Sequence, residues 1–149
     1  MAKTGIISDP IDVNRELEEI AKETSLKGGG AIVLFMGYVK GLVNDNYVHE
    51  LDYEAYEPHA SRILNEIASQ AEREEGILEV RVYHRIGNLK PGEPTIYVIV
   101  AAKTRHVAFE VARKVLEEVK HKVPIFKLEK RSDGEYWVVG NGRRVKKKQ

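Results

Sequence analysis

The sequence predicts one α+β domain built from three helices and about seven strands. Three segments repeat apolar residues at the helical period of about 3.6, and the others alternate or are continuously apolar, as strands are. Helical and strand segments are interspersed, and 149 residues suit one hydrophobic core. We therefore expect a single domain over residues 1–140, followed by a basic, mobile tail over residues 141–149.

The first predicted element is a short strand over residues 4–8. A helix follows over residues 11–24, because its apolar residues share one face and Asp12 is placed to cap its first turn. Three glycines at 28–30 end this helix. The next run, 31–39, is continuously apolar, which predicts a strand buried on both faces.

A turn at residues 41–46 is expected to lead into an alternating strand over residues 47–56, exposed on one face. Pro58 stands at a favoured first position for a second helix, which extends to about Glu74. Gly76 closes this helix.

The second half contains a strand over residues 77–86, a turn over 87–94 and a buried strand over 95–102. The third helix extends from about Arg105 to Lys122, with small and branched apolar residues at helical spacing.

Pro124 ends the third helix. Residues 125–131 and 135–139 then predict a hairpin around Asp133 and Gly134. The chain thus ends its predicted fold on two antiparallel strands, before the basic tail.

The charge balance argues against nucleic-acid and membrane partners. The net charge is +1, but five basic residues at the C-terminus leave 19 basic against 23 acidic residues elsewhere. A nucleic-acid-binding domain carries its basic surface on the folded body instead. No apolar run approaches the ~18 residues of a membrane span, and the N-terminus lacks the apolar region of a signal peptide. We therefore expect a cytoplasmic protein.

Several catalytic classes are disfavoured by the residues present. The chain has no cysteine, which excludes disulfides, thiolate metal sites and a cysteine nucleophile. The histidines show no metal-ligand spacing, so we expect no metal site. Gly28, Gly29 and Gly30 precede a strand and lack the phosphate-loop pattern, and no serine lies in a nucleophile elbow.

His84 and Arg85 follow one another on a predicted strand, so they point to opposite faces of it. The simplest interpretation is a hydrogen-bonded histidine and a surface arginine. We assign neither of them a catalytic role.

Thr104 and Arg105, at the start of the third helix, form a candidate anion site. Free backbone N–H groups and the helix dipole favour an anion there, and arginine adds a bidentate partner for phosphate or carboxylate. In the alternative, Thr104 only caps the helix and Arg105 pairs with a surface acid such as Glu110. The residues alone leave both interpretations open.

The opposite end of this helix carries Lys120, His121 and Lys122, where the helix dipole stabilises cations. The dipole does not account for Lys127, which lies between two apolar residues of the predicted strand and on the same face as Glu129. Apolar neighbours and nearby cations lower the pKa of a lysine, which suits it to proton transfer or nucleophilic work.

Arg105 and Lys120 are separated by about 22 Å along one helix, at ~1.5 Å per residue. One small ligand does not easily reach both within one chain. Either there are two sites, or a second copy brings its helix start to the lysines of the first copy.

Six linked motifs follow one another from about Gly30 to Val139: FMGYVKG, LDYEAYEPHA, YHRIGNLKPGE, TRHVAFE, KHKVPIFKLE and DGEYWV. Together they resemble the large, catalytic subunit of molybdopterin synthase. The resemblance implies an α/β hammerhead fold with an additional antiparallel β-sheet. It also implies a heterotetramer in which a central homodimer binds two ubiquitin-like sulfur-carrier subunits.

The family converts cyclic pyranopterin monophosphate to molybdopterin, with sulfur from the C-terminal Gly-Gly thiocarboxylate of the small subunit. The resemblance therefore implies a sulfurtransferase of molybdenum cofactor biosynthesis that holds no tightly bound cofactor. A chain without cysteine agrees with this chemistry, because the partner then has to bring the sulfur. A non-catalytic adaptor that binds a ubiquitin-like partner is the alternative.

By this resemblance, Lys120 falls on the essential lysine of the family and Lys127 on its second important lysine, so both are expected to be catalytic and to contact substrate. In the family, the arginine at the helix start comes from the other protomer. The remaining expected substrate-binding residues are Tyr38, Val39, Lys40, Thr104, Arg105, Leu128 and Glu129.

Two of these positions depart from the family pattern. Thr104 stands where the family usually has histidine, with His106 two places further on. Lys40 stands where it usually has arginine, which keeps the positive charge but loses the bidentate geometry for phosphate.

Overall fold

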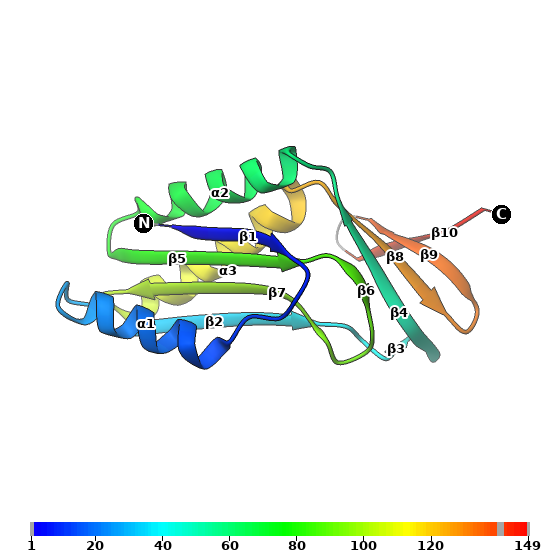
Figure 1. The fold of residues 1–149 in the computed structure, drawn as a ribbon, viewed down its shortest axis with the longest axis horizontal. Coiled ribbons are helices and arrows are strands. Elements are labelled where there is room, and N and C mark those ends of the chain that lie inside the picture. Colours follow the sequence, from blue (N-terminus) through cyan, green and yellow to red (C-terminus); the bar gives the residue numbers. More distant parts are fainter. Residues whose placement is uncertain (1, 140–141, 149) are drawn as a thin grey trace.

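The computed structural model describes residues 2–139 and 142–148, which form three helices and ten strands in two sheets (Figure 1). This arrangement confirms the predicted α+β class. The helices are α1 (Val13–Ser25), α2 (His59–Glu72) and α3 (Arg105–Lys122). The strands are β1 (Lys3–Ile7), β2 (Ala31–Tyr38), β3 (Leu42–Val43), β4 (Asn46–Ala55), β5 (Ile77–Arg85), β6 (Gly87–Leu89), β7 (Pro94–Ala102), β8 (Ile125–Arg131), β9 (Gly134–Val139) and β10 (Arg143–Lys146).

The first sheet has the strand order β1-β5-β7-β2, with β1 parallel to β5 and the other pairs antiparallel. Helices α2 and α3 pack together on one face, and α1 covers the opposite face (Figure 1). Alternation along β5 and β7 supplies both cores. Val80 and Val98 face α2 and α3, whereas Ile99 and Ala101 face α1.

The second sheet has the order β10-β9-β8-β4-β3, with β6 also paired to β4. It stands beyond the end of the first sheet, as Figure 1 shows. Leu51 and Tyr53 of β4 pack with Val39 and Leu89 in a separate buried cluster, and Ile125 of β8 packs against this cluster and against the main core. The two sheets are therefore held together by apolar side chains at their junction.

The local signals for helix and turn ends are largely confirmed. Asp12 accepts a hydrogen bond from the backbone N–H of Arg15 at 3.2 Å, as expected of an N-cap. Pro58 immediately precedes α2. The hairpin between β8 and β9 turns at Ser132 and Asp133, and Gly134, which pairs with Arg131, has a φ of 132° in the region that favours glycine.

Strand β2 corrects the prediction of a strand buried on both faces. It pairs only with β7, so it is an edge strand among the described residues, and none of its side chains is fully buried. Ile32 and Phe35 pack against the cores on opposite faces of the sheet, which explains the continuously apolar run. These residues are half-exposed because no strand of the described residues pairs with the outer side of β2, and the local sequence does not reveal this.

Two predicted turns also contain short strands. Leu42–Val43 pair with Asn46 and Tyr47 of β4, and Gly87–Leu89 pair with Leu51–Tyr53. The first pairing is a local hairpin that turns at Asn44 and Asp45, both with positive φ. The second joins segments far apart in the chain, so it depends on a tertiary contact that a turn-like composition does not show.

The C-terminal segment differs from the mobile tail that the sequence predicts. Arg143–Lys146 form β10, antiparallel to β9. The Lys147 ammonium lies 3.4 Å from the Glu135 carboxylate, and Arg144 pairs with Glu129. Acidic side chains on neighbouring strands thus give these cations fixed partners. Residues 140, 141 and 149 lie outside the described residues.

Candidate active site

One end of the first sheet collects most of the predicted site residues. Tyr38, the last residue of β2, lies opposite Pro94 at the start of β7. Helix α3 follows β7 and packs back along β7 and β2, so its C-terminal end returns to the same end of the sheet. Tyr38, Lys40 and Lys120 therefore belong to one end, and Arg105 to the other.

Strand β8 brings Lys127 to this end. After α3 the chain turns at Pro124, whose carbonyl oxygen accepts a hydrogen bond from the backbone N–H of Tyr56. Lys127 then lies opposite Tyr53 of β4, with its Nζ 5.7 Å from the centre of the Tyr53 ring. The Tyr53 ring in turn meets the His84 ring edge-on at 5.2 Å. Lys127 thus lies beside two buried rings.

Burial, the nearby Lys120 ammonium and the Arg144 guanidinium together lower the pKa of Lys127 to about 8, against an opposing effect of Glu129. This confirms the lowered pKa that its apolar neighbours predict. At pH 7 about one tenth of Lys127 is then the free amine, which can accept a proton, and the remainder is an ammonium ion, which can donate one.

His84 is a neighbour of this site that the sequence argument missed. It is buried, and its Nδ1 lies 2.7 Å from the carbonyl oxygen of Arg85, to which it donates. Burial, with the charges of Lys127 and Lys120, lowers the pKa of His84 to about 4, so the ring is neutral near pH 7. The alternation along β5 could have indicated it, since an even-numbered residue there faces α3.

Arg85 is buried, contrary to the expected surface arginine. Its guanidinium donates to the carbonyl oxygens of Ser8 and Pro94, at 3.0 to 3.2 Å, and pairs with Glu93 at 3.4 Å. These bonds join the ends of β1, β5 and β7. Arg85 therefore has a structural role that composition alone did not indicate.

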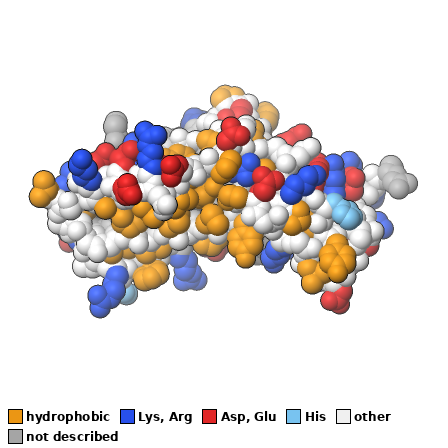
Figure 2. Space-filling view, turned by 60° about the horizontal axis from the view of Figure 1, so that its bottom comes forward, with side chains coloured by type: hydrophobic (Ala, Val, Ile, Leu, Met, Phe, Trp, Pro, Cys, Tyr) orange, Lys and Arg blue, Asp and Glu red, His pale blue; other side chains and the backbone are white. Residues whose placement is uncertain are grey.

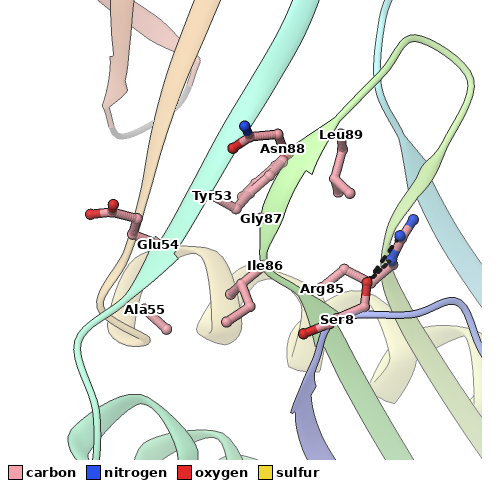
Figure 3. Close-up of a pocket in the computed structure, with 9 residues that line it drawn as sticks. All are labelled: Ser8, Tyr53, Glu54, Ala55, Arg85, Ile86, Gly87, Asn88 and Leu89. Carbon is pink, nitrogen blue, oxygen red and sulfur yellow. Dashed lines mark hydrogen bonds between the residues drawn. The ribbon is translucent and has the colours of Figure 1, made fainter.

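A cavity of about 550 Å³ opens on the same junction (Figure 3). Tyr53 lines it, so one ring borders both the cavity and Lys127. Figure 3 also shows the Arg85 guanidinium turned to Ser8 at its border. The other lining residues are Glu54, Ala55, Ile86, Gly87, Asn88 and Leu89.

The residues after β2 divide between core and surface. Tyr38 and Lys40 are exposed, whereas Val39 is buried in the cluster at the sheet junction. The backbone N–H of Val39 donates to Glu93, and its carbonyl accepts from Gly92. Val39 thereby fixes the positions of its two exposed neighbours.

Leu128 and Glu129 are both buried, but they lie on opposite faces of β8. Leu128 pairs with Trp137 on the face away from Lys127. The Glu129 carboxylate receives two hydrogen bonds from Arg144 and lies 3.6 Å from Arg131. The contacts to substrate predicted for these two residues are untested.

Thr104 and Arg105 lie at the far end of α3. Thr104 occupies the N-cap position, but its side chain makes no capping hydrogen bond. His106, not Arg105, is the residue that approaches Glu110, at 3.5 Å. Within residues 2–139 and 142–148, Arg105 has no ion pair or side-chain hydrogen bond and is exposed. The pairing alternative proposed for Arg105 is therefore wrong, and its guanidinium is accessible to a ligand.

A model of the MoaE protein family matches residues 6–122. The chain belongs to the MoaE family. A relative from Pyrococcus abyssi (strain GE5 / Orsay), named molybdopterin synthase catalytic subunit, is 39% identical over 140 residues, covering 94% of this chain and 93% of the relative.

Two solved structures agree with this membership. The MoaE protein from Burkholderia ambifaria MC40-6 superposes with a TM-score of 0.77 at 29% identity, covering 100% of this chain and 93% of that one. Molybdopterin synthase from Staphylococcus aureus gives a TM-score of 0.76 at 29% identity, covering 89% and 93%. The family model ends at Lys122, before β8, whereas the Burkholderia structure also covers the part of the chain with Lys127, Glu129 and β10.

Nowhere in residues 2–139 and 142–148 do three His, Asp or Glu side chains gather as a metal ion would require. No helix of that part is long and apolar enough to cross a membrane.

The lowered pKa of Lys127 makes a prediction about stability. A lysine whose pKa is lower folded than unfolded destabilises the fold wherever it is protonated. This penalty is present in full below about pH 8 and is relieved as the pH rises toward 10.5. Lys127→Met should therefore raise the free energy of unfolding by about 2 kcal/mol at pH 7, discounted for partial solvent screening.

Urea unfolding of both proteins at pH 7 and pH 10 measures this effect. The advantage of the Lys127→Met variant should shrink at pH 10. A variant less stable than the parent at pH 7 would show that burial of this ammonium carries no penalty. Lys122→Met, at an exposed position on α3, is the matched control.

Proposed function

We propose that this chain is the catalytic subunit of a molybdopterin synthase. It would convert cyclic pyranopterin monophosphate to molybdopterin, with sulfur from the C-terminal Gly-Gly thiocarboxylate of a small ubiquitin-like carrier. The observation that carries the proposal is the pair of lysines at the end of α3 and on β8, one exposed and one with a pKa near 8, in a MoaE-family fold.

The chemistry of both reactants fits this pair. The phosphate of the substrate and the thiocarboxylate of the carrier are anions, and Lys120 offers an exposed cation beside Lys127. The chain has no cysteine to hold sulfur, so the sulfur has to arrive on a partner. The proposed reaction needs no tightly bound cofactor, because the thiocarboxylate itself supplies the group that is transferred.

The two lysines are assigned different work. Lys120 stabilises negative charge on the acyl oxygen as sulfur leaves the carrier. Lys127 exchanges protons with the reacting groups, since both of its protonation states are populated near neutral pH. Tyr53 and the neutral His84 exclude water from one side of the Lys127 amine.

Arg105 is proposed to act on the site of a second copy, because it lies about 22 Å along α3 from Lys120. The open edge of β2 offers a way to achieve this. Ala31 lies opposite Ala102, near Arg105, whereas Tyr38 lies at the Lys120 end, about 24 Å away at ~3.4 Å per residue. Antiparallel pairing of two β2 strands around a twofold axis therefore brings the Arg105 end of one copy to the Lys120 end of the other.

The surface along β2 suits such pairing. Met36 is 41% exposed and Tyr38 63% exposed. Figure 2, in which the side carrying β2 and α1 comes forward, shows hydrophobic side chains gathered in a band across the middle of the molecule. A long apolar edge strand is stable in solution when another strand covers it.

Reconstitution tests the proposed function. Purified chain, thiocarboxylated carrier and cyclic pyranopterin monophosphate should together yield a dithiolene pterin, detected after oxidation to a fluorescent derivative. Carrier with an ordinary C-terminal carboxylate is the control and should yield none. Binding of the carrier without any product would instead support a non-catalytic adaptor.

A further inference from the structure

The strand β10 lies against the site through one side chain, that of Arg144. Its Nε and Nη2 donate to the two oxygens of Glu129 at 2.8 and 3.1 Å, and its Nη1 donates to the carbonyl oxygen of Gly142. Glu129 is 2% exposed and lies two residues from Lys127 on the same face of β8. A bidentate pair on a buried carboxylate is a fixed arrangement, unlike an exposed ion pair.

We propose that Arg144 is a positioning residue of the lysine site, which holds the Glu129 carboxylate in a bidentate pair and so prevents it from pairing with the Lys127 ammonium. The last strand of the chain, which lies beyond residues 6–122 matched by the family model, then becomes part of the machinery that sets the protonation of Lys127 (Figure 1). The effect of Arg144 on turnover rests on the proposed function, whereas its effect on the protonation of Lys127 does not.

The groups around Lys127 show why this pair matters. Tyr53 of β4 and His84 of β5 are uncharged neighbours near pH 7, because burial raises the pKa of Tyr53 to about 12 and lowers that of His84 to about 4. Lys120 of α3 and Arg144 of β10 are positive neighbours. Glu129 is the negative group acting on Lys127, and Arg144 covers both of its oxygens.

Loss of Arg144 removes a positive charge near Lys127 and also frees the carboxylate of Glu129. Both changes favour the ammonium form of Lys127. Arg131 does not replace Arg144, since its Nε and Nη2 are bonded to Asp133 and its Nη1 lies 3.6 Å from Glu129. The structure therefore has one residue that holds Glu129 by two short bonds.

Arg143 provides a matched control. It precedes Arg144 on β10, so its side chain points to the opposite face of the second sheet, and it is exposed. Arg143→Gln and Arg144→Gln remove the same charge from the same strand. Only the second removes the partner of Glu129.

The test is pulse labelling of the full chain with an amine-acylating reagent between pH 6 and 10, with the labelled Lys127 peptide quantified by mass spectrometry. Arg144→Gln should raise the pKa of Lys127 by about one pH unit, which lowers its labelling rate at pH 7 about tenfold. Arg143→Gln should leave the rate within about twofold of the parent, and Arg144→Lys should fall in between.

Glu129→Gln is a second variant, which tests whether Arg144→Gln acts through Glu129 or only by disturbing β10. With Arg144 intact and the carboxylate gone, the labelling rate of Lys127 should increase. An unchanged rate in Arg144→Gln, an equal loss in Arg143→Gln, or a decrease in Glu129→Gln would each overturn the proposal.

In the reconstituted reaction, the Arg144→Gln rate should recover above pH 9. A shift in labelling without any turnover in the parent would sink the proposed function and leave the role of Arg144 intact.

Discussion

Lys120→Ala and Arg105→Ala should each lose turnover by at least about a hundredfold as homodimers, yet a heterodimer of the two variants should regain about half of the parent activity. The heterodimer has one site with both Lys120 and Arg105 present and one site with neither. This result follows from the ~22 Å between the two side chains on α3 and from the antiparallel pairing proposed for β2. Two affinity tags allow the heterodimer to be isolated before the assay.

The reverse arrangement is the control. A chain carrying both substitutions, paired with an unchanged chain, leaves every composite site with one substituted residue, so its activity should stay near zero. If Lys120 and Arg105 instead act on a site within one chain, the activities expected of the two heterodimers are reversed. The doubly substituted heterodimer would then be half active and the singly substituted one inactive.

The pairing itself can be separated from the chemistry. Met36→Lys, at a position with no expected contact to substrate, places a charge on the exposed surface of β2 and should turn the proposed dimer into monomers, as sedimentation would show. Turnover should fall with the loss of the dimer. A dimer that persists in Met36→Lys would mean that another surface joins the two copies.

The helices and most strands could be predicted because their signals are local. Asp12 caps α1, Pro58 precedes α2, and the apolar spacing of α3 is complete within eighteen residues. The outer edge of β2 was mistaken for a buried position, because a continuously apolar run shows that both faces are covered but not whether a neighbouring strand is present. Its place in the sheet depends on the pairing of β7, far along the chain.

The lysines of the candidate site were accessible to sequence reasoning, and their surroundings were not. Lys127 between apolar neighbours indicated a lowered pKa, which the burial of its side chain confirms. Tyr53, His84 and Arg144 come from three other strands. The register of β4 with β8 brings Tyr53 near Lys127, and the registers of β8 with β9 and of β9 with β10 bring Arg144 there. The C-terminal segment was predicted to be mobile because a run of cations in the sequence does not show which carboxylate it pairs with. In the fold, Arg144 of this segment pairs with the buried Glu129.

Arg81 is expected to be the most costly single substitution for the fold outside the site. Its side chain is fully buried, and its guanidinium bonds Glu79 on β5 and Glu16 and Glu19 on α1, with Glu23 at 3.7 Å. α1 is attached to the first sheet by this cluster and by a small apolar contact around Ile20. Removal of Arg81 leaves four carboxylates facing one another without their shared counter-ion.

Arg81→Leu should lower the free energy of unfolding by about 3–5 kcal/mol at pH 7, because an ion cluster that loses one partner keeps its uncompensated charges. In the variant, the carboxylates of the cluster repel one another, and acid relieves this repulsion by removing their charge. The lost stability should therefore return in part as the pH falls below about 5.

Lys3→Ala, which removes the exposed partner of Glu19 at the rim of the same cluster, is the control and should cost about 1 kcal/mol or less. Chemical unfolding at pH 7 and pH 5 measures both effects. Equal losses of unfolding free energy in the two variants would mean that the buried Arg81 stabilises the attachment of α1 no more than the exposed Lys3 does.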